Sequence, residues 1–300
     1  MSDLNFDIVS IKDPSEVAAD TTLSNVYHKG QQKIWDGRKV LDELIAKHGK
    51  PKLEIRQKHA LIKVLTLILW GELAAWKTSA ILSADIDDMG AKLAATSQTH
   101  DEARHFYVML DYMRKVLDYQ PEGKQYLSDY AEVGLNEVVN TSSMARRILG
   151  MQLMVEPVAI TIFRQLREGE VEPILSELLT YYEKDEARHI ALGVKYLPLV
   201  IKKMTFSDVC QLFVWQCKML KYEVDGLKDI APSFDMLGIK ADDVLSAAEK
   251  RQKEAAQDMV DELGWNLPIV SAMDRFLRAY INLKWFGKSY VGAARELVGV

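Results

Sequence analysis

The 300-residue chain has few of the residues that interrupt or cross-link a fold: 2 cysteines, 8 prolines and 16 glycines. Cys210 and Cys217 lie seven residues apart in a segment of helical pattern, a rise of about 10 Å that excludes a disulfide between them. Two cysteines cannot build a thiolate metal site either. The scarcity of glycine and proline instead favours long, uninterrupted elements.

The chain also lacks an excess of positive charge. Its 38 basic and 43 acidic residues give a net charge of −5, and no basic run occurs, which argues against a nucleic-acid-binding surface. The N-terminus lacks the basic and apolar regions of a secretory signal, so we expect a cytoplasmic protein with no membrane span. With 48% apolar residues, the chain can bury a sizeable core, which excludes intrinsic disorder.

Apolar residues recur at helical spacing over long windows, and strand-like alternation is hard to find, so the sequence predicts an all-α fold. The gap at residues 120–136 predicts a crossover that carries a short helix. No linker divides the chain, and we expect one domain over residues 1–300 with its core at about 55–203. Four core helices are predicted at about 55–84, 87–119, 137–168 and 171–203, the spacing of a four-helix bundle, with additional helices at 25–48 and within 206–297 (206–230, 242–263 and 268–297).

An internal repeat organises this core. The pentapeptide Asp-Glu-Ala-Arg-His occurs at residues 101–105 and again at 185–189, an offset of 84 residues. The same offset carries Glu72 onto Glu156, so a lone glutamate precedes the glutamate of each pentapeptide by 30 residues. The repeat is therefore a pair of helices, and we expect the two copies to pair about a pseudo-two-fold axis.

The repeat places carboxylates and imidazoles on the same helical faces. Glu72 and Glu156 each lie in an apolar window, where an unpaired carboxylate costs several kcal/mol and must be neutral, paired or metal-bound. In each pentapeptide, glutamate and histidine are three residues apart and share one face. Four carboxylates balance two divalent cations; the sequence thus predicts a dinuclear metal site, with a structural polar network as the alternative. The predicted ligands are Glu72, Glu102, His105, Glu156, Glu186 and His189.

Two aspartates are candidates for orienting the ligand histidines. A metal-bound imidazole usually donates its second N–H to a carboxylate, so we expect Asp185 to orient His105 and Asp101 to orient His189. The alternative is that both aspartates pair locally with the arginines of the pentapeptides.

Three further features concern the surroundings of this site. Pro157, directly after Glu156, is expected to loosen or kink its helix. Trp76 and Tyr182 are candidates for a substrate pocket or an electron path, although aromatic residues at helical spacing more often belong to a core. Trp35 is expected to be a surface or packing residue.

At these residues the chain resembles the ferritin-like di-iron carboxylate superfamily, in particular its branch of oxidases and oxygenases similar to ribonucleotide reductase small subunits. The shared pattern covers about residues 55–199 and is specific for the superfamily, not for a substrate. The resemblance implies a ferritin-like four-helix bundle whose six ligands hold two iron ions, or one manganese and one iron ion, and activate O2. It also implies a homodimer.

Departures from individual families narrow the expected function. Met109 stands where a reductase small subunit has its radical tyrosine, and Tyr182 stands where arylamine N-oxygenases have a third histidine. Ala75 and Met151 replace the crosslinking valine and tyrosine of the ligand-binding oxidases. Ferritins and rubrerythrins are much shorter chains, which argues against iron storage.

The main hypothesis is a monooxygenase or oxidase that takes electrons from an external donor and oxidises a small organic substrate. The reaction would be hydroxylation, N-oxygenation, desaturation or oxidative cleavage. One alternative is a ferroxidase or O2-scavenging protein without an organic substrate, and another is a radical-generating subunit that acts on a partner protein. The helices after Phe206, which could cover a pocket, argue against the first alternative, and Met109 argues against the second.

Overall fold

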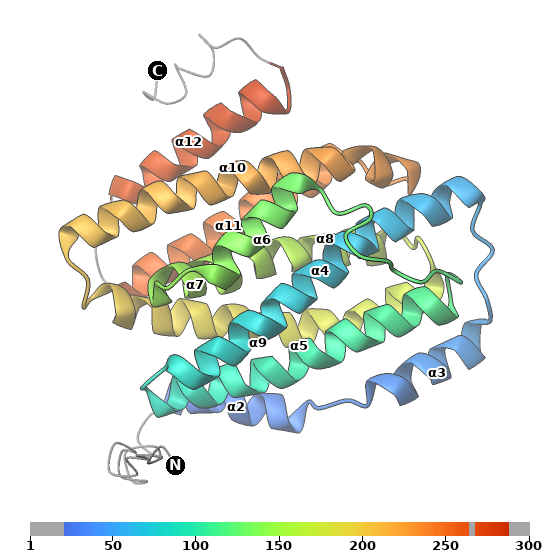
Figure 1. Cartoon of the computed structure of the whole chain (residues 1–300), viewed down its shortest axis with the longest axis horizontal. Helices are drawn as coiled ribbons and strands as arrows, with labels where there is room; N and C mark the ends of the chain where they lie inside the picture. Colours follow the sequence, from blue (N-terminus) through green and yellow to red (C-terminus); the bar gives the residue numbers. More distant parts are fainter. Residues whose placement is uncertain (1–20, 264–267, 288–300) are drawn as a thin grey trace, which may run out of the picture.

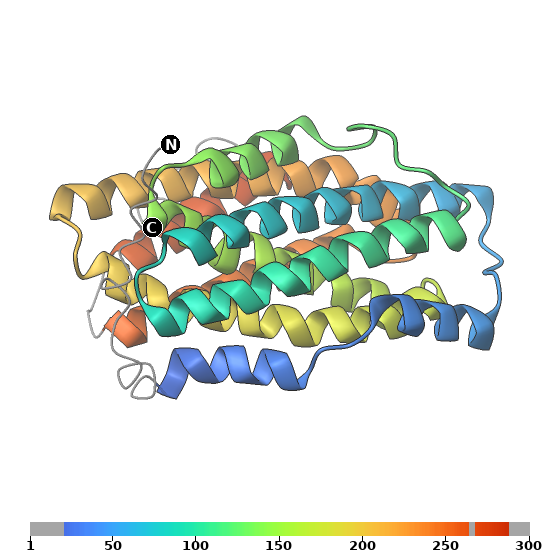
Figure 2. The ribbon, with the colours of Figure 1, turned by 60° about the horizontal axis from the view of Figure 1, so that its bottom comes forward.

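The described part of the chain, which in this computed structural model comprises residues 21–263 and 268–287, is built of helices joined by loops. No strand occurs within these residues. Four long helical segments lie side by side, and the other helices pack around them (Figures 1 and 2). The four segments are α4 (Ile55–Asp85), α5 (Met89–Lys115), the composite α7–η2–α8 (Met144–Gly150, Met151–Val155 and Glu156–Glu168) and α9 (Pro173–Ile201). The predicted all-α bundle is confirmed.

The third bundle segment differs from its prediction as one helix over 137–168. Residues up to Asn140 belong to a separate helix, α6 (Asp129–Asn140), because Thr141 and Ser143 supply side-chain oxygens that end one helix and begin the next. Ser143 Oγ accepts a hydrogen bond from the backbone N–H of Arg146 at 3.4 Å. The helix expected in the crossover is therefore α6, and it is longer than predicted.

A π-helical turn interrupts the same segment where Pro157 was expected to loosen it. Residues Met151–Val155 form the turn η2, and α8 begins directly after it with Glu156 and Pro157. Proline has no backbone N–H, so it cannot donate the hydrogen bond to residue i−4 that would continue a regular helix. The expected disturbance next to Glu156 is confirmed, and it takes the form of a π turn.

The N-terminal helix predicted at 25–48 is two helices, α2 (Thr21–Gln32) and α3 (Gly37–His48). Asp36 caps α3 by accepting a hydrogen bond from the N–H of Lys39 at 3.0 Å. Both helices pack on α5 and α9, along one side of the bundle (Figure 2). Trp35 lies in the break between them.

The C-terminal helices pack near α4, α6 and α8. They are α10 (Phe206–Met236), α11 (Ala241–Leu263) and α12 (Pro268–Lys284). The first continues past its predicted end at residue 230 despite Pro232 within it, and the part of the last prediction beyond residue 287 lies outside the described residues. Cys210 and Cys217 are both free thiols, as predicted.

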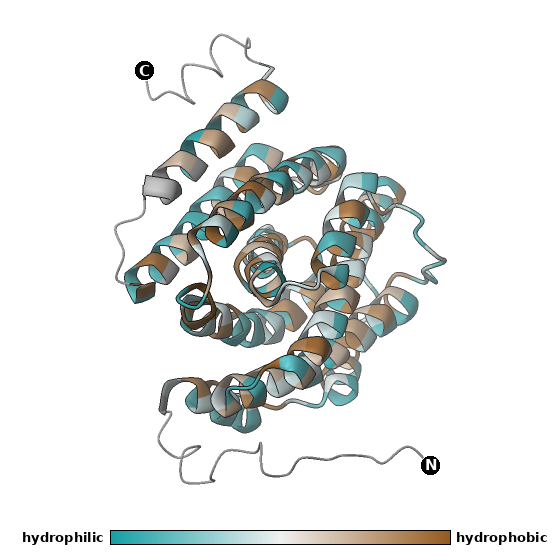
Figure 3. Cartoon of the chain, turned by 60° about the vertical axis from the view of Figure 1, so that its left-hand side comes forward, coloured by the Kyte–Doolittle hydropathy of each residue, from teal (hydrophilic) through white to brown (hydrophobic). Residues whose placement is uncertain are grey.

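Each bundle helix has a buried face and a solvent-facing one, so hydrophilic and hydrophobic residues occur on the same helices (Figure 3). α4 differs from the other helices in its overall hydropathy. Within the described chain it is the one helix that is long and apolar enough to cross a membrane. Most of its apolar stretch is buried inside the bundle, where Leu61, Val64 and Leu65 have no exposed surface. Its hydropathy is therefore that of a core helix.

Candidate metal centre

The six predicted ligands converge at the middle of the bundle. Each of the four segments contributes: α4 gives one carboxylate, α8 gives one at its first residue, and α5 and α9 give one carboxylate and one imidazole each. None of the six residues is more than 4% exposed. They are Glu72, Glu102, His105, Glu156, Glu186 and His189.

The first group of ligands surrounds His105. Its Nδ1 atom lies 3.0 Å from Glu186 Oε1, 3.3 Å from Glu72 Oε2 and 3.6 Å from Glu102 Oε2. One ligand atom from each of these four residues lies within 4.8 Å of all the others. This spacing allows one ion to contact the four residues together.

The second group surrounds His189 and shares two residues with the first. His189 Nδ1 lies 2.7 Å from Glu186 Oε2, 3.0 Å from Glu102 Oε1 and 3.8 Å from Glu156 Oε1. Glu102 and Glu186 thus direct one oxygen to each histidine, while Glu156 approaches only this group. The arrangement has the form of two adjoining four-ligand sites joined by two bridging carboxylates.

Three buried atoms of the first group have no hydrogen-bond partner among the described residues: Glu102 Oε2, His105 Nδ1 and Glu186 Oε1. Buried polar atoms without a partner are rare because each costs free energy. All three belong to one four-residue group, so a single cation bound there would satisfy them together. The donor set therefore fits a divalent metal ion.

The four carboxylates differ in their pKa values. Burial raises the pKa of Glu72 and of Glu156 well above the usual value. Burial also acts on Glu102 and Glu186, but the positive charges of the histidines outweigh it and lower the pKa of both. Without metal, these directions favour the ionised form of the two bridging carboxylates and the protonated form of the two outer ones.

The two imidazoles balance the bridging carboxylates. Burial would lower the pKa of His105 and of His189, but the neighbouring carboxylates, among them Asp185 at His105 and Glu102 at His189, raise the pKa of both well above the usual value. These directions favour two imidazolium ions facing the carboxylates Glu102 and Glu186. With protons also on Glu72 and Glu156 the cluster would be neutral, because four protons carry the charge of two divalent ions.

Asp101 and Asp185 each contact a ligand histidine and also pair with an arginine of the pentapeptides. Asp185 Oδ2 lies 3.1 Å from His105 Nε2, and Asp101 Oδ2 lies 3.5 Å from His189 Nε2. Arg104 Nη2 also donates to Asp101 at 2.5 Å and to Asp185 at 2.8 Å. The arginines neutralise the aspartates, which remain free to accept from the imidazoles.

Trp35 belongs to this network and is not merely a packing residue. Its indole Nε1 donates a hydrogen bond to Asp185 Oδ2 at 2.8 Å, and the guanidinium of Arg104 lies 4.8 Å from its ring centre. Trp35 is partly exposed. A hydrogen-bonded path therefore runs from the protein surface through Asp185 to His105.

Two glutamines at the centre were not predicted from the sequence. Gln98 Nε2 donates to Glu102 Oε1 and to Glu156 Oε1, both at 3.0 Å, and Gln152 Nε2 donates to Gln98 Oε1 at 3.1 Å. Both side chains are buried. Each glutamine lies four residues before a glutamate ligand, and this i, i+4 spacing was the available signal.

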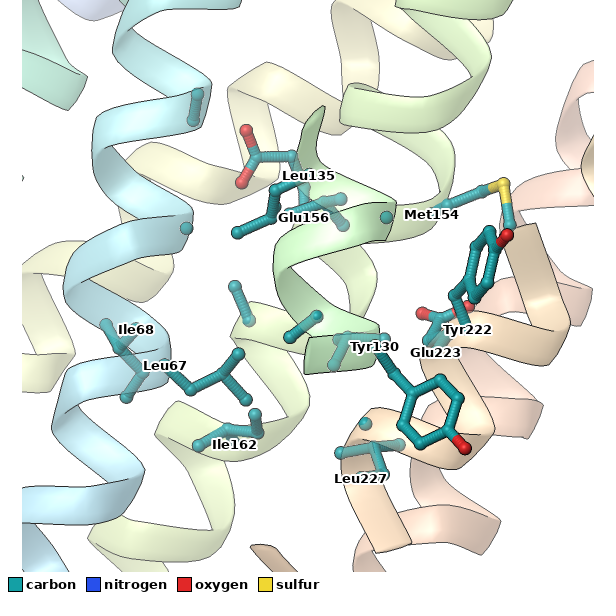
Figure 4. Close-up of a pocket in the computed structure, with 18 of the residues that line it drawn as sticks. Leu67, Ile68, Tyr130, Leu135, Met154, Glu156, Ile162, Tyr222, Glu223 and Leu227 are labelled. Carbon is teal, nitrogen blue, oxygen red and sulfur yellow. The ribbon is translucent and has the colours of Figure 1, made fainter. Parts of the chain in front are cut away.

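A cavity adjoins the two outer carboxylates, Glu72 and Glu156 (Figure 4). It lies between α4, α6, η2–α8 and α10, holds about 850 Å³ of empty space including its open part, and has mostly aliphatic walls. The pocket positions predicted for Trp76 and Tyr182 need correction, because neither lines this cavity. Trp76 is 38% exposed and packs near Phe106.

Tyr182 instead supports a ligand histidine. Its ring stacks on that of His105 with 4.2 Å between ring centres, and its hydroxyl donates to the His105 carbonyl oxygen at 2.7 Å. Both contacts are with α5, and Tyr182 does not line the cavity.

Comparisons with known proteins address the fold. No family model and no curated protein matches the sequence. The structure is similar to "Protein 19", which has aldehyde deformylating oxidase activity and comes from Synechococcus, with a TM-score of 0.60 and 13% identity over 82% of this chain and 98% of that chain. The chain has a ferritin-like fold.

This ferritin-like chain was also matched to variants of an R2-like ligand-binding oxidase with an aerobically reconstituted Mn/Fe cofactor. Two of these variants are 14% and 15% identical to this chain. Each match covers 90% of this chain and 95% of the variant's chain, with a TM-score of 0.49. The similarity to "Protein 19" confirms the resemblance drawn from the ligand pattern at the level of the fold.

Proposed function

We propose that this chain is a dinuclear non-haem oxidase or monooxygenase that uses O2 to oxidise a small organic substrate. The observation that carries the proposal is the pair of four-ligand groups that share Glu102 and Glu186 and border an apolar cavity. Two bound iron ions, or one manganese and one iron ion, would supply the redox chemistry with O2 as co-substrate. Glu72 with His105 would hold one ion, and Glu156 with His189 the other.

The residues around the ligands would fix the histidines in a metal-binding state. Asp185 and Asp101 accept at Nε2 of the two rings, which keeps a proton on that nitrogen and directs Nδ1 to the carboxylates. Burial alone would raise the pKa of Asp185, but its hydrogen bond with His105 and the charge of Arg188 lower it. The aspartates thus stay ionised, as this role requires.

Substrate and electrons would reach the centre from different sides. The cavity places its aliphatic walls next to Glu72 and Glu156, so an apolar substrate there would exclude water from the reacting atoms. An external donor would pass electrons through Trp35 and Asp185, which lie on the α2–α3 side. A ferroxidase or O2 scavenger needs no such cavity, so the cavity supports an organic substrate.

Metal content and optical spectra test this proposal. The full chain would be purified in air, analysed for metals, reduced under nitrogen with added iron, and then exposed to O2. Two ions per chain and a transient absorption band after O2 are expected, and both should be lost in a Glu102→Gln, Glu186→Gln variant. Fewer than about half an ion per chain after anaerobic loading would show that the six residues form a structural network.

A further inference from the structure

The α10 wall of the cavity carries a carboxyl group that the proposed metal centre does not use. Glu223 lines the cavity, and its Oε1 atom is buried without a hydrogen-bond partner among the described residues. Figure 4 shows Glu223 on α10 and Glu156 on α8, at two different places on the cavity wall. The cavity therefore has a second polar point away from the outer ligands.

This carboxyl group has no cationic neighbour among the described residues that line the cavity, which include no lysine or arginine. The neighbour that hydrogen-bonds to Glu223 is the uncharged side chain of Gln252. Burial raises the pKa of Glu223 to about 8. Glu137 on α6 is a useful contrast, because Lys218 of α10 donates to its carboxylate at 2.7 Å.

We propose that Glu223 is the recognition group of a substrate subsite and binds the amino group of an apolar amine. An ammonium group donates hydrogen bonds to Oε1, and its positive charge stabilises the ionised carboxylate against the effect of burial, which otherwise favours the protonated form. A carboxylate ligand would instead oppose ionisation of Glu223, and an alcohol would supply a donor without the charge.

The subsite also fixes the orientation of the substrate. With its nitrogen at Glu223, the amine extends its hydrocarbon part along the aliphatic walls toward Glu72 and Glu156, which border the same cavity. The inference rests on the proposed function only for the reaction that follows. Binding of the amine requires neither metal nor O2.

Binding of three eight-carbon probes tests the subsite. Octylamine, octanol and octanoate would be titrated calorimetrically into the full chain, with and without bound metal. Octylamine should bind about tenfold or more tightly than the other two. Glu223→Gln, which keeps the shape of the side chain, should remove this preference, whereas the control Glu137→Gln should leave it unchanged. Equal affinities for the three probes, or unchanged octylamine binding in Glu223→Gln, would overturn the proposal.

A second variant tests the cavity independently of Glu223. Gly71 lines the cavity, and a Cβ atom there would meet nothing within 4 Å, so Gly71→Leu should fill the space without a clash and abolish binding of all three probes. Retained octylamine binding would place the site elsewhere. Metal content measured on the same samples separates the two proposals. Absence of bound metal with intact amine binding contradicts only the metal centre, and bound metal without preferential amine binding contradicts only the subsite.

Discussion

Binding of two divalent ions to the metal-free chain should release about four protons per chain at pH 7. The perturbation is a titration with Mn²⁺, which avoids reaction with O2. In the metal-free centre, burial raises the pKa of Glu72 and Glu156, and the neighbouring carboxylates raise the pKa of His105 and His189. These directions favour one proton on each of the four residues, which a bound metal ion would have to displace.

The magnitude follows from the charge of the centre. Glu102 and Glu186 are already ionised, because the imidazolium charges lower the pKa of both, so they release nothing. The four displaced protons carry the same charge as the two ions that replace them. Since protons compete with metal for the same atoms, the affinity for Mn²⁺ should also rise with pH.

Calorimetric titrations at one pH in buffers of different ionisation enthalpy give the number of protons released. The matched variant Glu72→Gln has no proton to lose at that position. It should release about one proton fewer per chain than the unsubstituted protein does when it binds the same number of ions. Release of fewer than about two protons, or an affinity that does not change with pH, would refute the charge assignment. The ions would then bind outside the cluster.

Three other substitutions give distinct outcomes. Glu102→Gln should reduce bound metal more than Glu72→Gln, which leaves the second group intact; equal losses by elemental analysis would contradict the bridging role. Trp35→Phe removes the hydrogen bond to Asp185 and should slow reduction of the metals about 10-fold, measured by stopped flow; an unchanged rate would exclude this path. Gly150→Ala, whose Cβ would lie 2.6 Å from a side chain of α6, should cost about 1–3 kcal/mol in chemical denaturation, and an unchanged midpoint would contradict this packing.

The bundle and its six converging residues could be predicted because the signal is local. The repeated pentapeptide fixes the face of each helix through i, i+3 spacing, and the constant offset of 84 residues relates the two halves. Glu72 and Glu156 were conspicuous because a charged residue in an apolar window has few alternatives to burial with a partner. Such signals require no knowledge of how distant segments pack.

The break at Trp35 and the cavity could not be predicted in this way, because both depend on tertiary contacts. Gly37 begins α3 where its backbone closely approaches Val108 of α5; a Cβ atom there would lie 2.2 Å from Val108 Cγ2. No local pattern reports that approach. The cavity is likewise formed by α6 and α10 against the bundle, and Glu223 is an ordinary polar position of an amphipathic helix until tertiary packing, with Gln252 of α11 as a neighbour, buries its Oε1 atom.

The two halves of the centre share their ligands but differ in what surrounds them. Gln98 donates to Glu102 and Glu156 in the second group, whereas the residue 84 positions later, Tyr182, donates to the backbone of His105. The first group therefore lacks an amide donor of this kind, and its buried atoms are the ones left without partners. A duplicated ligand set has thus acquired two inequivalent positions. Two different ions, such as the manganese and iron considered in the proposed function, would find two distinguishable positions here.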